Sequence, residues 1–326
     1  MRAWTVRQFG EYTKEVTLGE LPDPKAEGGT AIIEVHATGI NFADILNIRG
    51  QYQIKAPFPF SPGMEAAGVV VEAGPDSPHK VGDRVVTVNV VGGCAGKAIA
   101  TGFGSYPIPD EMSFAQAAAF TINYQTGYFA LVRRGRLKAG ETVLVHAGAS
   151  GVGTAAIQLS KAYGATVIAT ASSPDKLDVC RQCGADHVIN YKETDFVPAI
   201  REVTGGRGVD VVYDPVGGDT FDQSTKIMAF EGRILVIGFA SGRIPQVAAN
   251  RLLLKNIDVI GLFLGGYSMY HNEHVHEIQE DLYGLFRGGK LAPVIYDEYP
   301  FVDLPRALAD IESRRVYGKP ILLAAN

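Results

Sequence analysis

A turn with three glycines, set between an apolar run and a helical pattern, constrains this chain more than any other feature of its sequence. Residues 141–145 (Glu-Thr-Val-Leu-Val) are mostly apolar and β-branched, which is typical of a buried strand. Residues 154–163 carry an apolar stripe at helical spacing. Between them lie Gly148, Gly151 and Gly153. A strand, a glycine turn and a helix in this order open a dinucleotide-binding βαβ unit, in which free N–H groups at the helix N-terminus face the pyrophosphate.

One position of this turn departs from the usual pattern. Ser150 replaces the middle glycine of G-x-G-x-x-G, so the turn taken alone is also compatible with a plain tight turn. Val152 stands where the last glycine of a G-x-S-x-G nucleophile elbow would be, which argues against a hydrolase. We expect Gly148 to allow the tight turn, and Gly151 and Gly153 to let backbone and helix approach a pyrophosphate.

Two kinds of pattern divide the chain. Before Ser113, short β-like runs alternate with Pro, Gly and Asp turns, and only residues 41–50 look helical; this predicts a mostly antiparallel, barrel-like domain. After Ser113, strands and helices alternate. The expected strands are residues 142–145, 166–170, 187–190, 209–214, 233–238 and 258–263. Residues 114–120 are Ala-rich, and the expected helices include 123–134, 174–183, 196–203 and 221–230.

Alternating strands and helices predict a doubly wound parallel sheet, the Rossmann class of α/β fold. We place this domain at residues 122–261. The tail after it is too small for a domain of its own, so we expect it to fold back onto the first part. The first domain then comprises residues 1–121 and 262–326.

Composition narrows the classes of protein that remain. The net charge is −5 and no run of Lys and Arg stands out, which argues against a strong nucleic-acid-binding role. No uncharged apolar stretch reaches the ~18 residues of a transmembrane span, and the start lacks the apolar core of a signal peptide. Three cysteines cannot form a disulfide framework. We therefore expect a cytoplasmic protein of two domains.

The end of the second predicted strand indicates which dinucleotide is bound. An NAD-binding protein usually has Asp or Glu there, holding the ribose 2′-OH. Here Ala171 and Ser172 take that place, and Lys176 follows. A 2′-phosphate is repelled by an acid but favoured by Ser hydroxyls, a lysine and a helix N-terminus. We predict NADPH as the cofactor; the alternative is that Ser173 merely caps the next helix and Lys176 is solvated.

Four stretches of the chain together resemble one enzyme family. They are residues 41–44 (Asn-Phe-Ala-Asp), 139–153, 184–191 (Gly-Ala-Asp-His-Val-Ile-Asn-Tyr) and 205–214. In combination they resemble the quinone oxidoreductase (zeta-crystallin-like) branch of the zinc-free medium-chain dehydrogenase/reductases, and the similarity extends over essentially the whole chain. The resemblance implies a chaperonin-10-like catalytic domain interrupted in sequence by the Rossmann domain, with the active site between them.

The resemblance also implies individual site residues. The positions that match the pyrophosphate turn are Ser150, Gly151 and Val152. Those that match 2′-phosphate and adenine-ribose contacts are Ser172, Lys176 and Tyr191. The positions lining the nicotinamide and substrate are Asn41, Tyr52 and Thr126. Backbone contacts to the two ends of the cofactor match Phe239, Phe263 and Gly265. Of these, Tyr52 and Asn41 are the expected catalytic residues, with either one as a hydrogen-bond donor to the reduced acceptor.

The same comparison predicts that no catalytic metal is present. Zinc-dependent relatives carry a Cys near the position of Asp44 and a His-Glu pair after the Pro-Gly turn. Here Met64 replaces that His, and Asp44 with Glu65 does not make the usual set of zinc ligands. We expect a zinc-free enzyme.

Two other groups of residues are interpreted as structural. Cys180 and Cys183 close a predicted helix, whereas a redox C-x-x-C opens one, so packing is favoured. His271, His274 and His276 do not share one helix face, which favours a solvated segment over a metal site.

Without a metal, the reaction indicated is hydride transfer from NADPH to a small electrophilic acceptor whose developing anion is delocalised. A quinone is our first choice. The alternatives are C=C reduction of enones, enals or enoyl thioesters, and a non-enzymatic NADPH-binding protein with a structural or nucleic-acid-binding role. We also expect a homodimer without membrane attachment, from the resemblance and from the apolar runs 252–254 and 259–264.

Overall fold

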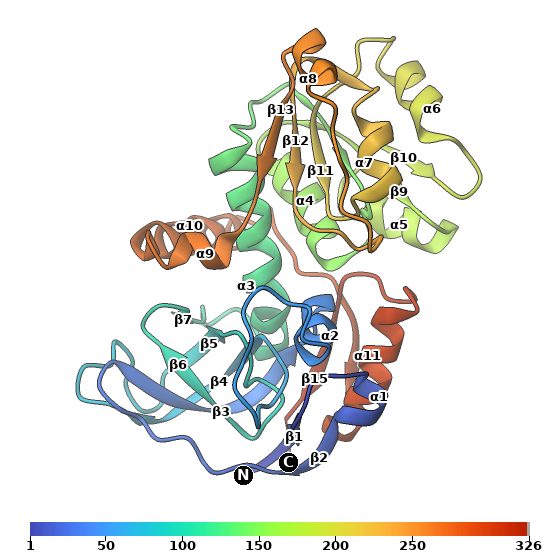
Figure 1. The fold of residues 1–326 in the computed structure, drawn as a ribbon. Coiled ribbons are helices and arrows are strands. Elements are labelled where there is room, and N and C mark those ends of the chain that lie inside the picture. The colour runs from blue at the N-terminus through green and yellow to red at the C-terminus, as the bar shows by residue number, and fades with distance from the viewer. Residues whose placement is uncertain (325–326) are drawn as a thin grey trace. The chain divides into compact units, whose positions relative to one another are not determined.

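The computed structural model describes residues 1–324. Its contacts divide the chain into two compact units, one formed by Met1–Ile122 with the chain from Pro293 onward, and the other by Asn123–Ala292 (Figure 1). The predicted domain boundary after residue 261 differs from this division, because residues 262–292 group with the second unit. The return of the C-terminal segment to the first unit begins only at Pro293.

The first unit is built on a seven-stranded sheet in the order β14-β15-β3-β4-β5-β7, with β6 also paired to β3. All of its pairs are antiparallel except β14 with β15. β1 and β2 form a separate antiparallel pair. The strands are β1 (Arg2–Thr5), β2 (Thr17–Glu20), β3 (Thr30–Gly39), β4 (Glu65–Ala73), β5 (Arg84–Val88), β6 (Lys97–Thr101), β7 (Ser105–Pro107), β14 (Ile295–Tyr299) and β15 (Lys319–Leu323).

Short helices cover part of this unit and create its main apolar core. They are α1 (Tyr12–Glu15), α2 (Phe42–Ile48), η2 (Phe301–Asp303) and α11 (Leu304–Glu312). Ile45 and Ile48 of α2 and Leu304 and Leu308 of α11 belong to one buried cluster that also contains Trp4. Burial of such side chains stabilises the unit by roughly 1.5–3 kcal/mol each before ordering entropy is counted. It also anchors α2, which begins directly after the predicted site residue Asn41.

The second unit contains a six-stranded sheet in which every pair is parallel, in the order β10-β9-β8-β11-β12-β13. The strands are β8 (Thr142–Val145), β9 (Thr166–Ala171), β10 (His187–Asn190), β11 (Val209–Asp214), β12 (Met228–Val236) and β13 (Asp258–Gly261). In sequence order along the sheet this is 3-2-1-4-5-6, the Rossmann arrangement, and its right-handed crossovers place helices on both faces. The predicted doubly wound sheet and mostly antiparallel partner domain are confirmed.

Within residues 1–324, nine helical segments belong wholly or partly to the second unit and lie around the sheet or beside it (Figure 1). They are α3 (Phe114–Tyr128), its π-helical continuation η1 (Phe129–Arg134), α4 (Gly151–Ala162), α5 (Pro174–Gln182), α6 (Phe196–Val203), α7 (Gly218–Ser224), α8 (Ala249–Lys255), α9 (Leu264–Ser268) and α10 (Asn272–Arg287). Among the described residues, none of the helices is long and apolar enough to cross a membrane.

The largest differences from the predicted bounds concern three stretches of the chain. The Ala-rich residues 114–120 and the predicted helix 123–134 form one continuous helical stretch. α4 begins at Gly151, three residues before the apolar stripe that predicted it. β12 begins at Met228, inside the predicted helix 221–230, because Met228 pairs with Val209 of β11. Glu231 has a left-handed φ of 58°, and the register between these two strands shifts at this place. No local sequence pattern predicts this shift.

Candidate functional site

The turn between β8 and α4 leaves backbone donors free. Ser150 is the N-cap of α4, and its Oγ accepts a hydrogen bond from the N–H of Gly153 at 3.1 Å. The N–H groups of Gly151 and Val152 have no partner among the described residues, as is usual in the first turn of a helix. Together with the positive end of the helix dipole, these groups form a site able to receive an anion such as a pyrophosphate.

The glycines of the turn serve close packing. The left-handed backbone belongs to Ala147, with φ 48°, and not to Gly148. A Cβ at Gly148 would lie 2.9 Å from both the Cβ of Ala169 and the Sγ of Cys180. A Cβ at Gly153 would lie 2.2 Å from the carbonyl oxygen of Ala147. The missing Cβ at Gly148 therefore lets the turn pack closely against β9 and α5. The missing Cβ at Gly153 lets α4 lie directly on the turn.

The predicted 2′-phosphate residues gather at the carboxyl ends of β9 and β10. The N–H of Tyr191 donates to the carbonyl oxygen of Ala171 at 3.1 Å, which brings the segment after β10 beside Ser172. Ser173 is the N-cap of α5, but its side chain makes no capping hydrogen bond. The simple capping alternative is therefore not what the structure shows. Lys176 lies in the first turn of α5, and no acidic residue precedes Asp175 there.

The remaining predicted site residues are divided between the two units. Thr126 is half-buried on α3. Phe239 follows β12 and is 39% exposed. Phe263 is the N-cap of α9, and its ring covers the glycine pair that follows: a Cβ at Gly265 would lie 3.4 Å from it. Asn41 and Tyr52 lie in the first unit. The roles of all these residues stay predictions.

A buried histidine, His146, directly follows β8, and no sequence pattern indicated its partners. His146 is 1% exposed; its Nδ1 hydrogen-bonds with the hydroxyl of Thr170 at 3.0 Å and its Nε2 with that of Ser224 at 2.9 Å. Burial lowers its pKa to about 3, so the ring is neutral at physiological pH. Next to it in the sheet, Asp214 accepts hydrogen bonds through Oδ1 from the N–H groups of Val216 and Gly217. His146 thus links β8, β9 and α7, which is a structural task.

In the first unit, four polar side chains meet where β3, β4, α2 and β15 come together. Asn41 precedes α2, and Asp44 lies in its first turn. Glu65 opens β4 and is 1% exposed; its Oε2 accepts a hydrogen bond from the N–H of Ile122 at 2.9 Å. Lys319, from the far end of the chain, contacts Glu65 Oε1 and donates to Asn41 Oδ1 at 2.5 Å. No sequence pattern signalled Lys319.

Asp44 and Tyr52 have shifted acidities for identifiable reasons. Asp44 accepts hydrogen bonds from the N–H groups of Asn41 at 2.7 Å and Gly63 at 3.1 Å, yet burial raises its pKa to about 6. Burial also raises the pKa of Tyr52, and the nearby Asp44 carboxylate adds to the effect. The Tyr52 hydroxyl therefore keeps its proton at neutral pH. It has no hydrogen-bond partner within residues 1–324 and is able to donate to a ligand.

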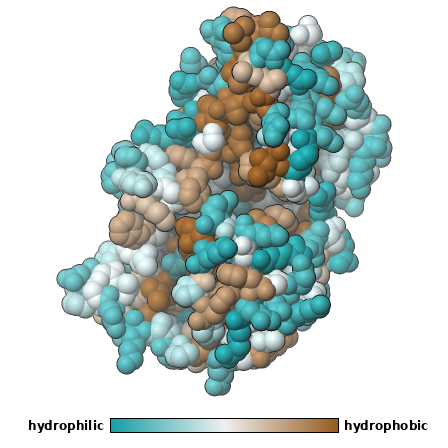
Figure 2. All heavy atoms as spheres, in the orientation of Figure 1, coloured by the Kyte–Doolittle hydropathy of each residue, from teal (hydrophilic) through white to brown (hydrophobic). Residues whose placement is uncertain are grey.

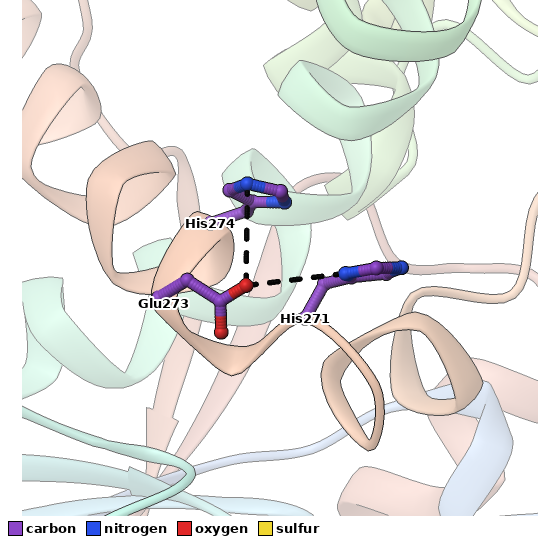
Figure 3. Close-up of side chains that lie close together, drawn as sticks. All are labelled: His271, Glu273 and His274. Carbon is purple, nitrogen blue, oxygen red and sulfur yellow. Dashed lines mark ion pairs between the residues drawn. The ribbon is translucent and has the colours of Figure 1, made fainter.

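Three side chains of the types that bind metals, His271, Glu273 and His274, lie close together at the start of α10 (Figure 3). Oε1 of Glu273 is 3.9 Å from Nδ1 of His271 and 4.0 Å from Nε2 of His274. The two imidazole planes are 19° apart and stacked. The ring of Tyr267 stacks on His274 and lies tilted by 38° against His271. Because a metal must lie close to the plane of each imidazole it binds, two nearly parallel rings do not converge on one ion. The arrangement is an exposed aromatic stack.

The raised pKa of Asp44 predicts a pH dependence of stability. Between its ordinary value of 3.8 and about 6, the folded protein retains a proton that the unfolded chain releases. The stabilisation associated with this group is thus fully present below pH 3.8 and is lost as the pH rises through 6. The loss amounts to about 3 kcal/mol at ~1.4 kcal/mol per pKa unit.

Urea denaturation of the parent protein and of Asp44→Asn between pH 4 and 7.5 measures this effect. The free energy of unfolding of the parent, taken relative to the variant, is expected to fall as the pH rises across this range, because other groups cancel in the difference. A difference that does not change with pH would contradict the assignment.

Comparisons with known proteins agree with this architecture. The family model described as zinc-binding dehydrogenase matches residues 151–280, and that of the alcohol dehydrogenase GroES-like domain matches residues 27–130. The quinone oxidoreductase-like protein 2 of Bos taurus is 38% identical over 314 residues, which span 96% of this chain and 90% of that protein.

Solved structures extend the likeness to the whole fold. The quinone oxidoreductase of Escherichia coli, crystallised with NADPH, is 32% identical and superposes with a TM-score of 0.91 over 99% of this chain and all of that one. The CurK enoyl reductase is 25% identical, with a TM-score of 0.89 over 99% of both chains. The chain therefore belongs to the quinone oxidoreductase branch of the medium-chain dehydrogenase/reductase superfamily.

Proposed function

We propose that this protein is an NADPH-dependent reductase that passes a hydride to a quinone. The observation that carries the proposal is the pairing of the glycine turn with an acid-free, hydroxyl-bearing end of β9 in a chain 32% identical to a quinone oxidoreductase crystallised with NADPH. When bound, NADPH supplies the hydride from C4 of its nicotinamide. The residues of this chain bind it, orient it and complete the reduction.

The residues present fit this cofactor. The free N–H groups of Gly151 and Val152 match a pyrophosphate, and the close approach at Gly153 keeps side chains out of the turn. The hydroxyls of Ser172 and Ser173 have no partner among residues 1–324, and Tyr191 lies next to them. These are groups that receive a 2′-phosphate without the repulsion of a carboxylate.

The acceptor side of the proposal rests on Tyr52. Reduction of a quinone or an enone by hydride places negative charge on an oxygen, and a donor aimed at that oxygen lowers the barrier. The Tyr52 hydroxyl keeps its proton and has no partner within the described chain, so it serves as that donor. Asn41, a partly buried member of the polar cluster, is the second residue that we propose for the acceptor side.

A C=C reductase is the second candidate, favoured by the similarity to CurK enoyl reductase. A quinone and a conjugated carbonyl accept hydride by the same geometry, so turnover must separate them. We expect NADPH oxidation to be fastest with benzoquinones or naphthoquinones, slower with short enals and slowest with crotonyl-CoA. Fastest turnover with the thioester would favour the second candidate. Tight NADPH binding without turnover of any acceptor would favour a binding protein.

The variant Tyr52→Phe tests whether the Tyr52 hydroxyl is the proposed hydrogen-bond donor. Removal of the donor is expected to lower kcat with the best acceptor by about 10- to 100-fold while leaving the KM for NADPH unchanged, since the hydroxyl acts on charge that develops only in the transition state. An unchanged kcat would remove Tyr52 from the mechanism.

The cofactor preference has its own test. Ser172→Asp introduces a carboxylate where the 2′-phosphate is expected, so the KM for NADPH should rise at least about tenfold, the equivalent of ~1.4 kcal/mol, while that for NADH changes little. Ser172→Ala is the control, because it removes a hydroxyl without adding charge. If both variants keep the parent's ratio of kcat/KM for the two cofactors, Ser172 does not contact the 2′-phosphate.

We also propose that the protein forms a homodimer through the free edge of its parallel sheet. β13 is the last strand of that sheet and pairs only with β12 within the described chain. Val259 on β13 and Leu253 and Leu254 on α8 are exposed, the last two by more than 70%. Figure 2 shows apolar side chains gathered over α8 and β13. An unpaired edge flanked by apolar surface suits a second copy of the same strand.

Light scattering on the purified protein tests this proposal. We expect twice the mass of one chain for the parent and the mass of one chain for Val259→Glu. Val203→Glu is the matched control, since Val203, at the end of α6, is 40% exposed and Val259 is 37% exposed. A monomeric parent, or equal dissociation by both substitutions, would contradict the proposed edge.

A further inference from the structure

A buried ammonium group lies at the centre of the polar cluster in the first unit, and the proposed function gives it no task. The side chain of Lys319 is 3% exposed. Its Nζ contacts Oε1 of Glu65 and donates to Oδ1 of Asn41 at 2.5 Å. A charged group is tolerated in the interior only when it is paired and hydrogen-bonded. Glu65 meets that requirement, yet the ammonium also reaches a neutral side chain.

The backbone holds Lys319 firmly on both sides. β15 pairs antiparallel with β3, so that Ile321 lies opposite Gly39, and the N–H of Lys319 donates to the carbonyl oxygen of Val294 at 2.8 Å. A Cβ at Gly39 would lie 2.7 Å from Cε of Lys319. The aliphatic stem of the lysine therefore crosses directly over Gly39, two residues before Asn41, and delivers its charge to that amide.

Glu65 determines where the ammonium can go. Oε2 of Glu65 is committed to the N–H of Ile122, which leaves Oε1 for Lys319. Burial raises the pKa of Glu65 while the Lys319 ammonium acts in the opposite direction. Asp44 is the other carboxylate facing this cluster, and it is occupied by the N–H groups of Asn41 and Gly63. The ammonium is thus clamped between one carboxylate and one amide.

The ammonium decides which way the Asn41 amide faces. An ammonium has donors only, whereas an amide has an oxygen that accepts and a nitrogen that donates. With Lys319 on one side, the oxygen must point to it. Nδ2 then faces the carbonyl oxygen of Gly39 at 3.2 Å and Oε1 of Glu65 at 3.4 Å. A cation on the carbonyl also polarises the amide, which makes its N–H groups stronger donors.

We propose that Lys319 is the positioning residue for Asn41: it fixes the orientation of the amide and strengthens its N–H groups toward the acceptor or the nicotinamide. This inference rests on the proposed function, in which Asn41 lines the reacting centre. The longer contact of Nδ2, to Glu65, is the one that a ligand oxygen replaces. Lys319 touches no reacting group itself and acts through Asn41.

The test uses a pair of substitutions that removes both charges. Lys319→Met alone would leave Glu65 buried without a partner and endanger folding. Lys319→Met combined with Glu65→Gln keeps the side-chain lengths, and the glutamine oxygen still accepts from Ile122. Lys319→Arg is the conservative variant that retains charge and donors. Lys161→Met, which breaks the half-exposed ion pair with Asp186 in the second unit, is the control.

Two readouts are measured on each folded variant. The first is the side-chain amide resonance of Asn41 in ¹⁵N–¹H NMR, assigned with Asn41→Ala. The second is kcat with the best acceptor, alongside the Kd for NADPH. In the double variant we expect the resonance to move and kcat to fall about 10- to 100-fold. The Kd for NADPH should stay within about threefold, equivalent to ~0.7 kcal/mol. Lys319→Arg should retain part of the activity, and Lys161→Met should resemble the parent.

A mutant cycle completes the test. Adding Asn41→Ala to the double variant should cost little further activity, because residues that act as one unit are non-additive. An unmoved resonance, or a double variant as active as the parent, overturns the positioning role and leaves a structural ion pair. If the parent reduces no acceptor at all, the proposed function fails; the resonance alone then decides whether Lys319 orients Asn41.

Discussion

The first unit depends on one buried ion pair between residues that lie far apart in the sequence. Lys319 and Glu65 are both almost fully buried, so each charge requires the other. To bring them together, β15 must pair with the end of β3, and β4 must begin where β3 ends. The same pairing sets Asn41 beside the ammonium and Asp44 one turn away. The polar cluster therefore forms only when the C-terminal strand β15 pairs with β3.

Around the turn between β8 and α4, the second unit is held by close approach between neutral groups. Gly153 lets α4 lie on the turn, Gly148 lets the turn lie on β9, and neutral His146 hydrogen-bonds to both sides of its strand. This leaves the helix N-terminus, the one strong local dipole of the turn, open for an anion. The second unit therefore presents backbone N–H groups that suit a dinucleotide. The first unit presents a protonated tyrosine and an amide held in one orientation, both of which suit an acceptor.

Much of the second unit could be predicted because its pattern is local. β8, β10, β11 and α6 were predicted with the bounds that the structure shows, since each lies between clear turn residues. The start of β12 was missed because Met228 is a strand residue only through its pairing with Val209. In the first unit, Asn41, Asp44 and Glu65 were noticed through the family's pattern, but their partner was not. Residues 262–292 were assigned to the other domain because their packing partners are distant in sequence.

The sequence alone determined the class of fold and the kind of cofactor, because a strand, a glycine turn, a helix and an acid-free second strand lie within about thirty-five consecutive residues, the length of one βαβ unit. Only the tertiary structure decided the chemistry of the other half. Lys319 and Glu65 are 254 positions apart, and a lysine after a glycine near the chain's end carries no signal of burial. Its role comes from the pairing of β15 with β3, which places a buried charge within hydrogen-bond distance of the Glu65 carboxylate and the Asn41 amide.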